Sequence, residues 1–305
     1  MDEGKERILG RQSRWRQLNN DRAAVVGAAI LTLVFIASCT AALVESWLGV
    51  SGVETDLLSR LAPPSARHIL GADEAGRDEL VRLLRAGQTS LTIGLIGALG
   101  ASLIGTLIGA VSGYFRGRVD MVLMRFTDFM MALPHLPILI ILAALDLSKL
   151  GFSQQFINSG AAGYWRIVLI MTLLGWTGVA RLVRGSTLEL SEREFVLAAR
   201  ALGAGTWRIL GRHVVPNAIT PVIVATTIAV GRIILTESGL SFLGLGIQPP
   251  LTSWGNMLNN AQELLGIAPM LAILPGALIL LTVIAINFLG DGLQAAFDPR
   301  RDIRY

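Results

Sequence analysis

The segment SEREFVLAARALGAGTWRILGRHVVP, residues Ser191 to Pro216, is a polar stretch between two strongly apolar regions of the chain. Ser191 is followed three residues later by Glu194, which is the spacing of a capping box, where a serine hydroxyl and a glutamate carboxylate each accept a backbone N–H. We therefore expect a helix to begin at Ser191. Gly203 is suited to ending that helix in the left-handed region, and Pro216 to ending the short helix that follows.

The first of these two helices has one apolar face made of small side chains. Its residues recur at i, i+3, i+4 and i+7, namely Phe195, Ala198, Ala199 and Leu202. Arg193 and Arg200 point elsewhere, so the face is flanked by positive charge. Such a face is suited to docking into a groove on a cytoplasmic partner. Packing against the chain's own helices is the alternative, and helix periodicity fits both interpretations.

The same stretch resembles the EAA loop, the cytoplasmic loop of permease subunits of ATP-binding-cassette importers. The motif reads Glu-Ala-Ala, three residues, Gly, nine residues, Ile-x-Leu-Pro, and Gly203 and Pro216 fall at its offsets when counted from Ala198 and Ala199. Leu197 replaces the motif glutamate, and Glu194 is not its equivalent, so no partner contact of that carboxylate is carried over. The resemblance implies an ATPase-coupling loop over 184–216 that includes Ser191, Glu194, Phe195, Ala198, Ala199, Arg200, Gly203 and Pro216.

The composition is that of a membrane protein. Apolar residues make up 52% of the chain and charged residues 16%, against roughly a quarter in soluble domains. The net charge is +4, from 26 basic and 22 acidic residues, but the basic residues gather at the borders of apolar runs, which argues against nucleic-acid binding. Cys39 is the single cysteine, so neither a disulfide nor a cysteine metal site is expected.

Six apolar runs are long enough to cross the roughly 30 Å hydrocarbon core as helices. They lie at about 23–44, 89–115, 119–145, 165–183, 217–235 and 268–289. The first run is longer than the apolar part of a signal peptide, so we interpret it as an anchor. The predicted fold is an all-α polytopic membrane protein, in which residues 89–290 form a permease core of five helices.

The distribution of basic residues predicts the topology. Lys and Arg concentrate in the arm 1–22, the loop 116–118, the region 181–212 and the tail 291–305, so both termini are expected in the cytoplasm. The segment 45–88, expected to contain an interfacial helix, and the segment 236–267, which lacks Lys and Arg, are then periplasmic.

Three further segments resemble one branch of that permease family, the dipeptide, oligopeptide and nickel importers. Residues 70–83 follow the signature LGTDxxGRDxLSRL, with Ala72 and Val81 as departures. Residues 238–255 follow SxLxFLGLGxxPPxPxWG, with Thr252 in place of the last proline. The tail carries the DGL and DPR tripeptides of the family at residues 291–293 and 298–300.

Two sets of residues inside the apolar runs stand out. Small residues recur every four positions in the second run, at Gly97, Ala101, Gly105, Gly109 and Gly113, and such a stripe lets another helix approach closely. The third run contains Asp128 and His135, which are candidates for lining a translocation pathway because ionisable groups at membrane depth face protein or water. The alternative is an Arg125–Asp128 pair on one face together with a proline kink.

The chain has no GxxxxGK[ST] phosphate loop, no HExxH zinc helix and no GxSxG elbow. We therefore expect a subunit without catalysis, metal or cofactor of its own. The resemblance implies a multi-pass permease subunit of the bacterial inner membrane, forming half of the pathway of an ATP-driven importer for peptides or related small solutes. Its implied partners are the lipid bilayer, a second homologous permease, two ATPase subunits that bind ATP and a periplasmic solute-binding protein, with no nucleic acid.

Two other classes stay open at this point. An ion-gradient-driven secondary transporter or channel would need an ion relay, for which only Arg125, Asp128, His135 and Arg232 are hints. A membrane scaffold without transport would be compatible with the glycine stripe, but less so with a capped cytoplasmic loop.

Overall fold

The structure, a computed structural model, describes residues 19, 21–145, 147–157, 160–259 and 261–297. Most of the predicted N-terminal arm and half of the tail, including the DPR tripeptide, lie outside these residues. The described chain consists of helices and loops, with one isolated bridge between Ala72 and Asp78. The helices are α2 (Arg22–Cys39), α3 (Ala41–Leu48), η1 (Leu57–Ser59), α4 (Glu79–Phe115), α5 (Gly117–Ala132), α6 (His135–Ala143), η2 (Leu147–Leu150), α7 (Gln154–Ile157), α8 (Gly160–Leu190), α9 (Glu194–Ala201), α10 (Thr206–Ile209), the π-helix η3 (Leu210–Val214), α11 (Val215–Phe242), α12 (Trp254–Met257), α13 (Ala261–Leu264) and α14 (Met270–Phe297).

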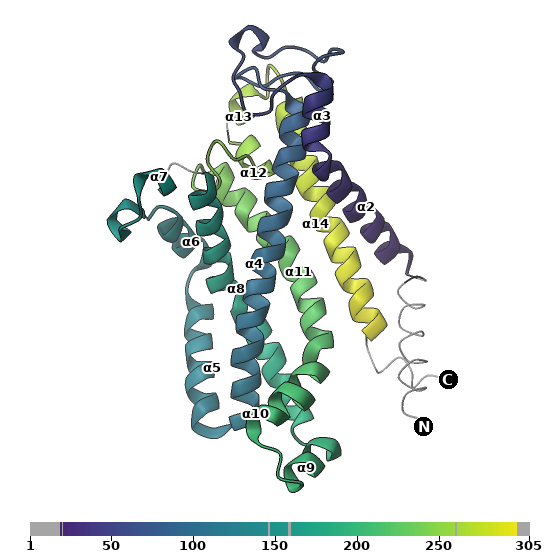
Figure 1. The fold of residues 1–305 in the computed structure, drawn as a ribbon, viewed down its shortest axis with the longest axis vertical. Helices are drawn as coiled ribbons and strands as arrows, with labels where there is room; N and C mark the ends of the chain where they lie inside the picture. Colours follow the sequence, from purple (N-terminus) through teal and green to yellow (C-terminus); the bar gives the residue numbers. More distant parts are fainter. Residues whose placement is uncertain (1–18, 20, 146, 158–159, 260, 298–305) are drawn as a thin grey trace.

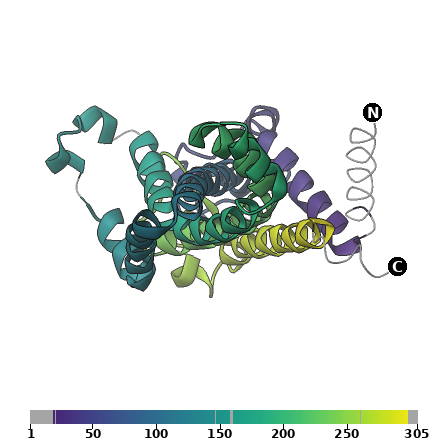
Figure 2. The same cartoon turned by 90° about the horizontal axis from the view of Figure 1, so that it is seen from below.

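Within the described residues, five helical stretches are long and apolar enough to cross a membrane: α2, α4, α8, the continuous helix from α10 to α11, and α14. The pair α5 and α6 passes the same test only when the two helices are taken together, and it bends by 83° at its break, so the spans number five or six. The prediction of an all-α polytopic membrane protein is therefore confirmed. In Figures 1 and 2, α5, α6 and α7 lie on one side of α4 and α8, while α2 and α14 lie on the other.

The second span begins ten residues earlier than predicted. The Asp78 carboxylate accepts the backbone N–H of Val81 at 2.9 Å and caps α4, which then continues unbroken to Phe115. The prediction of a separate interfacial helix before residue 89 is therefore wrong, since that sequence forms the first turns of α4. The first predicted span divides at Thr40 into α2 and α3.

The third predicted span is broken at Leu133 and Pro134. Leu133 has an extended backbone, with ψ of 137°, because a residue before proline is disfavoured in the helical region. The kink predicted from the prolines is therefore present, and α6 starts at His135 in a new direction.

The fifth span is longer than the predicted 217–235, because Pro216 does not end the helix before it. Helical structure runs from Thr206 to Phe242 through the π-helix Leu210–Val214. Pro216 lacks a backbone N–H, and the wider π-turn directly before it lets the chain continue as a helix past this missing donor.

Candidate functional site

The loop between α8 and α11 holds α9 and α10 at one end of the bundle, opposite the end that carries α3, α12 and α13 (Figure 1). Gly203 separates the two helices with φ of +80°, the left-handed conformation predicted for it. The amides of Gly203 and Ala204 donate to the carbonyls of Arg200 and Ala199, both at 3.0 Å, which closes the end of α9.

The predicted capping box is not formed. The amide and hydroxyl of Ser191 both donate to the Thr187 carbonyl, at 2.9 and 2.6 Å, because α8 extends to Leu190 and takes these donors. Arg193 is the residue that precedes α9, and it makes no side-chain cap. Glu194 is exposed in the first turn, where a carboxylate is favoured by the helix dipole.

One face of the loop is anchored in the bundle. Val196 of α9 is fully buried, and it packs in one cluster with Ile209, Leu210 and Val214 and with residues of α4, α8 and α11, namely Ala110, Val179, Val183 and Val222. Periodicity favoured the opposite face because the face through Val196 also contains Arg200 and is not uniformly apolar. The anchoring face was therefore missed.

The face predicted from periodicity is exposed. Phe195 is 43% exposed and Leu202 is 89% exposed, Ala198 lies between them at the surface, and Ala199 is half-buried. The alternative of packing against the chain's own helices therefore holds for Val196 and in part for Phe195, whose ring centre lies 6.3 Å from that of His213, whereas Leu202 is left at the surface. Trp207, which the sequence reasoning did not single out, adds a ring that is 72% exposed. Phe195, Ala198, Leu202 and Trp207 are called the exposed apolar face below.

Arg200 also lies at the surface of α9, with its guanidinium 5.5 Å from the centre of the Tyr114 ring of α4. Pro216 lies apart from the exposed apolar face, in the first turn of α11. The structure thus brings most of the predicted loop residues together on α9 and places Pro216 outside that group.

Ion pairs fix the base of the loop to α5. Arg184 of α8 donates from Nε and Nη2 to the two carboxylate oxygens of Asp120, both at 2.6 Å, which is a bidentate pair. Arg181 donates to Asp128 at 2.6 Å. The predicted pairing of Arg125 with Asp128 is therefore wrong, because Asp128 faces α8 instead of pairing within α5.

The two pathway candidates lie on different helices. Asp128 is exposed on α5 and engaged by Arg181, while His135 is exposed as the first residue of α6 beyond the break. Among the described residues no hydrogen bond or ion pair joins them. Nothing in this geometry makes Asp128 and His135 a single site.

The glycine stripe of α4 faces α8. A Cβ at Gly105 would lie 2.6 Å from the Trp176 carbonyl oxygen, and one at Gly109 would lie 2.4 Å from that of Ala180. Gly113 lies against Thr187 and Arg184, Ala101 is buried in the same contact, and Gly97 has more space, with its neighbours at 3.4 Å. The backbones of α4 and α8 therefore approach as closely as this stripe allows.

At the opposite end of the bundle, a buried carboxylate joins three segments. Glu237 of α11 is fully buried and accepts hydrogen bonds from Ser241 at 2.6 Å, Ser253 at 2.7 Å and Ser90 of α4 at 3.5 Å. Ser90 in turn accepts the backbone N–H of Trp254 at 3.2 Å. This cluster holds the loop after α11 against α4.

The segment before α4 is fixed by buried charges. Asp73 accepts hydrogen bonds from Arg77 at 2.8 Å and from Arg82, while Asp78 contacts His68 at 3.0 Å. Asp73, Arg77 and Asp78 come from residues 70–83, so polar positions of this signature stretch are used to fold the segment before α4.

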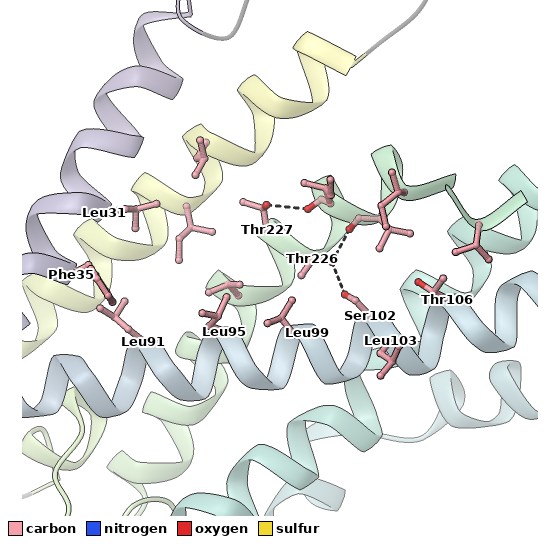
Figure 3. A pocket seen from close by; sticks show the side chains of 17 residues that line it. Leu31, Phe35, Leu91, Leu95, Leu99, Ser102, Leu103, Thr106, Thr226 and Thr227 are labelled. Atoms are coloured by element: carbon pink, nitrogen blue, oxygen red, sulfur yellow. Dashed lines mark hydrogen bonds between the residues drawn. The ribbon is translucent and has the colours of Figure 1, made fainter. Parts of the chain in front are cut away.

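Two cavities open on the membrane-spanning part of the chain. The first, of about 670 Å³, lies between α2, α4, α11 and α14, and Figure 3 shows its leucine lining together with the 2.6 Å hydrogen bond between Ser102 and Thr226. The second, of about 640 Å³, lies between α6, α11 and α14 and contains Arg232 and Asn287. The first cavity has no charged lining residue, whereas the second has one.

A bundle of five or six helices able to cross a membrane defines a multi-pass membrane protein. Residues 105–303 match the family of binding-protein-dependent transport system inner membrane components, and the chain belongs to this family. It is therefore a multi-pass inner-membrane component of a transport system. Components of this kind do not themselves hydrolyse ATP.

The chain is similar along most of its length to several permease proteins. A Brucella ovis protein that carries the name of a peptide permease is 40% identical over 93% of this chain and 89% of its own length. The dipeptide transport system permease protein of Bacillus subtilis is 37% identical, over 95% and 85%. The glutathione transport system permease protein of Pectobacterium atrosepticum is 35% identical, over 94% and 90%.

Proposed function

We propose that this chain is a permease subunit of an ATP-driven importer for peptides or related small solutes, coupled to separate ATPase subunits through the loop 191–216. It forms half of the pathway, and its partners are a second homologous permease, two ATP-binding-cassette ATPases and a periplasmic solute-binding protein. The exposed apolar face carries the proposal, since this face is displayed at the end of the bundle where the basic loops gather.

The loop has the two surfaces that a coupling element needs. Its exposed face offers Phe195, Leu202 and Trp207 to a groove, while its buried face holds Val196 in a cluster shared with α4, α8 and α11. Packed cores move as units because they resist continuous deformation. A displacement of α9 by a docked ATPase would therefore be passed to three spans at once.

The charge around this face indicates the chemistry of the partner surface. Arg208 and Arg212 are exposed in the same loop, whereas Arg193 is paired with Glu189 of α8 at 2.5 Å. A groove that is apolar at its centre and acidic at its rim would complement them, and complementary charge steers association. The motif glutamate is replaced by Leu197 here, so the contact rests more on apolar burial than on that carboxylate.

The solute class is supported by the relatives' names. Peptides, dipeptides and glutathione all carry amide, ammonium and carboxylate groups. A shared pathway for such solutes needs room and some polar lining, which the second cavity provides through Arg232, Thr236 and Asn287.

The experiment that tests the proposal is purification of the tagged chain in mild detergent, with identification of every co-purifying protein. We expect a second permease and an ATP-binding-cassette ATPase, with ATPase recovery reduced several-fold by Phe195→Asp, because the new charge would be desolvated on docking. Leu58→Asp is the matched control, since Leu58 is 99% exposed in the segment before α4, and it should leave recovery unchanged.

Two results would contradict the proposal. Equal ATPase recovery with Phe195→Asp and Leu58→Asp would show that the exposed apolar face is not the docking surface. Recovery of this chain alone, moving a solute in vesicles under an ion gradient, would favour the secondary-transporter alternative.

A further inference from the structure

Arg232 is a charged residue within a membrane-spanning helix. It follows a stretch of α11, residues 215–231, that carries no charged side chain. Its neighbour Ile233 lies 3.4 Å from a Cβ placed at Gly97 of α4, and α4 is uncharged from residue 86 to residue 115. Arg232 therefore lies at a level well inside the apolar part of the bundle. A charge at such depth is costly unless it faces protein or water, and it marks a functional site by default.

The surroundings of Arg232 form an open cavity, in which Arg232 itself is exposed. The cavity of about 640 Å³ is bounded by Leu136 and Ile140 of α6, by Arg232 and Thr236 of α11 and by Asn287 of α14. The start of α6 lies next to the break between α5 and α6. Non-helical backbone at membrane depth is tolerated where protein buries it or where it lines a water-filled cavity. The break and the arginine thus both point to a hydrated space.

No carboxylate of the described chain neutralises Arg232. None of the residues lining the cavity is Asp or Glu, and among the residues that the structure describes no ion pair involves Arg232. Glu237, five positions further along α11, is fully buried and engaged by Ser90, Ser241 and Ser253. The guanidinium is therefore available to an anion from outside this chain.

We propose that Arg232 binds the carboxylate of the transported solute inside this cavity, with Asn287 as a second polar contact. This inference rests on the proposed function and adds the recognised group to it. A guanidinium presents paired N–H donors that match the two oxygens of a carboxylate, and such a charge-assisted pair is stronger than a neutral hydrogen bond. Peptides have this group at their C-terminus, so one arginine would serve solutes with different side chains.

A carboxylate could also come from the partner permease, and the experiment separates the two sources. The purified complex and the isolated chain are treated with phenylglyoxal, which modifies accessible guanidinium groups, and the modification rates of Arg232 and Arg118 are followed by mass spectrometry. Arg118 is exposed in the first turn of α5, so it reports any effect on the reagent itself. The probes are acetate, dialanine and dialanine amide, which lacks the carboxylate.

We expect Arg232 to react in the complex, and to react several-fold more slowly with acetate or dialanine present, but not with dialanine amide. Arg118 should react equally in every sample. Three results would overturn the inference: equal Arg232 rates with dialanine and its amide, no protection by any probe, or reaction only in the isolated chain, which would assign the carboxylate to the partner. The wild-type chain is used throughout, so the modification rates cannot be changed by misfolding of a variant.

Failure of this inference is distinguishable from failure of the proposed function. The protein composition of the same purified complex shows whether an ATPase and a second permease are present. A complete complex in which Arg232 is unprotected would reject the carboxylate site and keep the importer, whereas a chain without an ATPase would reject the importer whatever the rates.

Discussion

Replacing Gly109 by alanine tests the contact between α4 and α8 most directly. The added Cβ would lie 2.4 Å from the Ala180 carbonyl oxygen and 2.9 Å from the Arg184 amide nitrogen. Both are backbone atoms, so no side chain can rotate away, and the two helices must separate by about 1 Å to restore an ordinary contact. Overpacking of this kind typically costs about 1–3 kcal/mol.

Gly178→Ala is the matched control, because Gly178 lies on α8 with no atom within 4 Å of a new Cβ. Both substitutions gain the same helix propensity, about 1 kcal/mol, so the difference between the two variants isolates the overlap. We expect Gly109→Ala to unfold at a temperature a few degrees lower than Gly178→Ala when thermal unfolding is measured in mild detergent. Identical melting temperatures would refute the close approach of the two backbones.

Three further outcomes are expected. Gly203→Ala should weaken ATPase co-purification, because φ of +80° strains alanine by roughly 1 kcal/mol, whereas Gly205→Ala, at φ of −70°, should not. Glu237→Ala should lower the free energy of unfolding by about 1–3 kcal/mol, since it leaves buried serine hydroxyls without their acceptor, and Glu237→Gln should cost less in the same thermal assay. Burial raises the pKa of Glu45, but hydrogen bonds from Arg85 and a backbone amide outweigh it and hold the pKa below its usual 4.5. The folded carboxylate is therefore favoured above pH 4.5, this stabilisation is lost as the pH falls through the lowered pKa, and Glu45→Gln should flatten the acid limb of a pH-dependent melting series.

The membrane class and the approximate spans could be predicted because they follow from local composition. A chain that crosses lipid must satisfy its backbone within each helix, so long apolar runs identify spans. Gly203 was predictable for a similar reason, since left-handed backbone strongly favours glycine. The start of α4 was harder to predict. Asp78 caps this helix well before the apolar run begins at residue 89, and the length of a helix alone does not show where it leaves the membrane.

The contacts that depend on distant residues were not predictable. Ser191 has the spacing of a cap, but its donors are taken by α8, whose end lies beyond the predicted span. Asp128 has an arginine three residues away and pairs instead with Arg181 on another helix. The contact of Glu237 with Ser90 joins residues 147 positions apart, and no local pattern signals such a pair. In each case a local spacing competed with a partner from elsewhere in the bundle.

The unbroken helix from Thr206 to Phe242 ties three features to one rotational register. It carries α10 of the loop between α8 and α11, Arg232 of the second cavity and Glu237 of the serine cluster along 37 residues. Each added residue turns everything beyond it by about 100°. A single insertion between Val222 and Arg232 would therefore swing the guanidinium out of its cavity and the Glu237 carboxylate away from the serines, without touching either residue. A single substitution in this interval keeps the rotational register of the helix, whereas a change in the length of the interval does not.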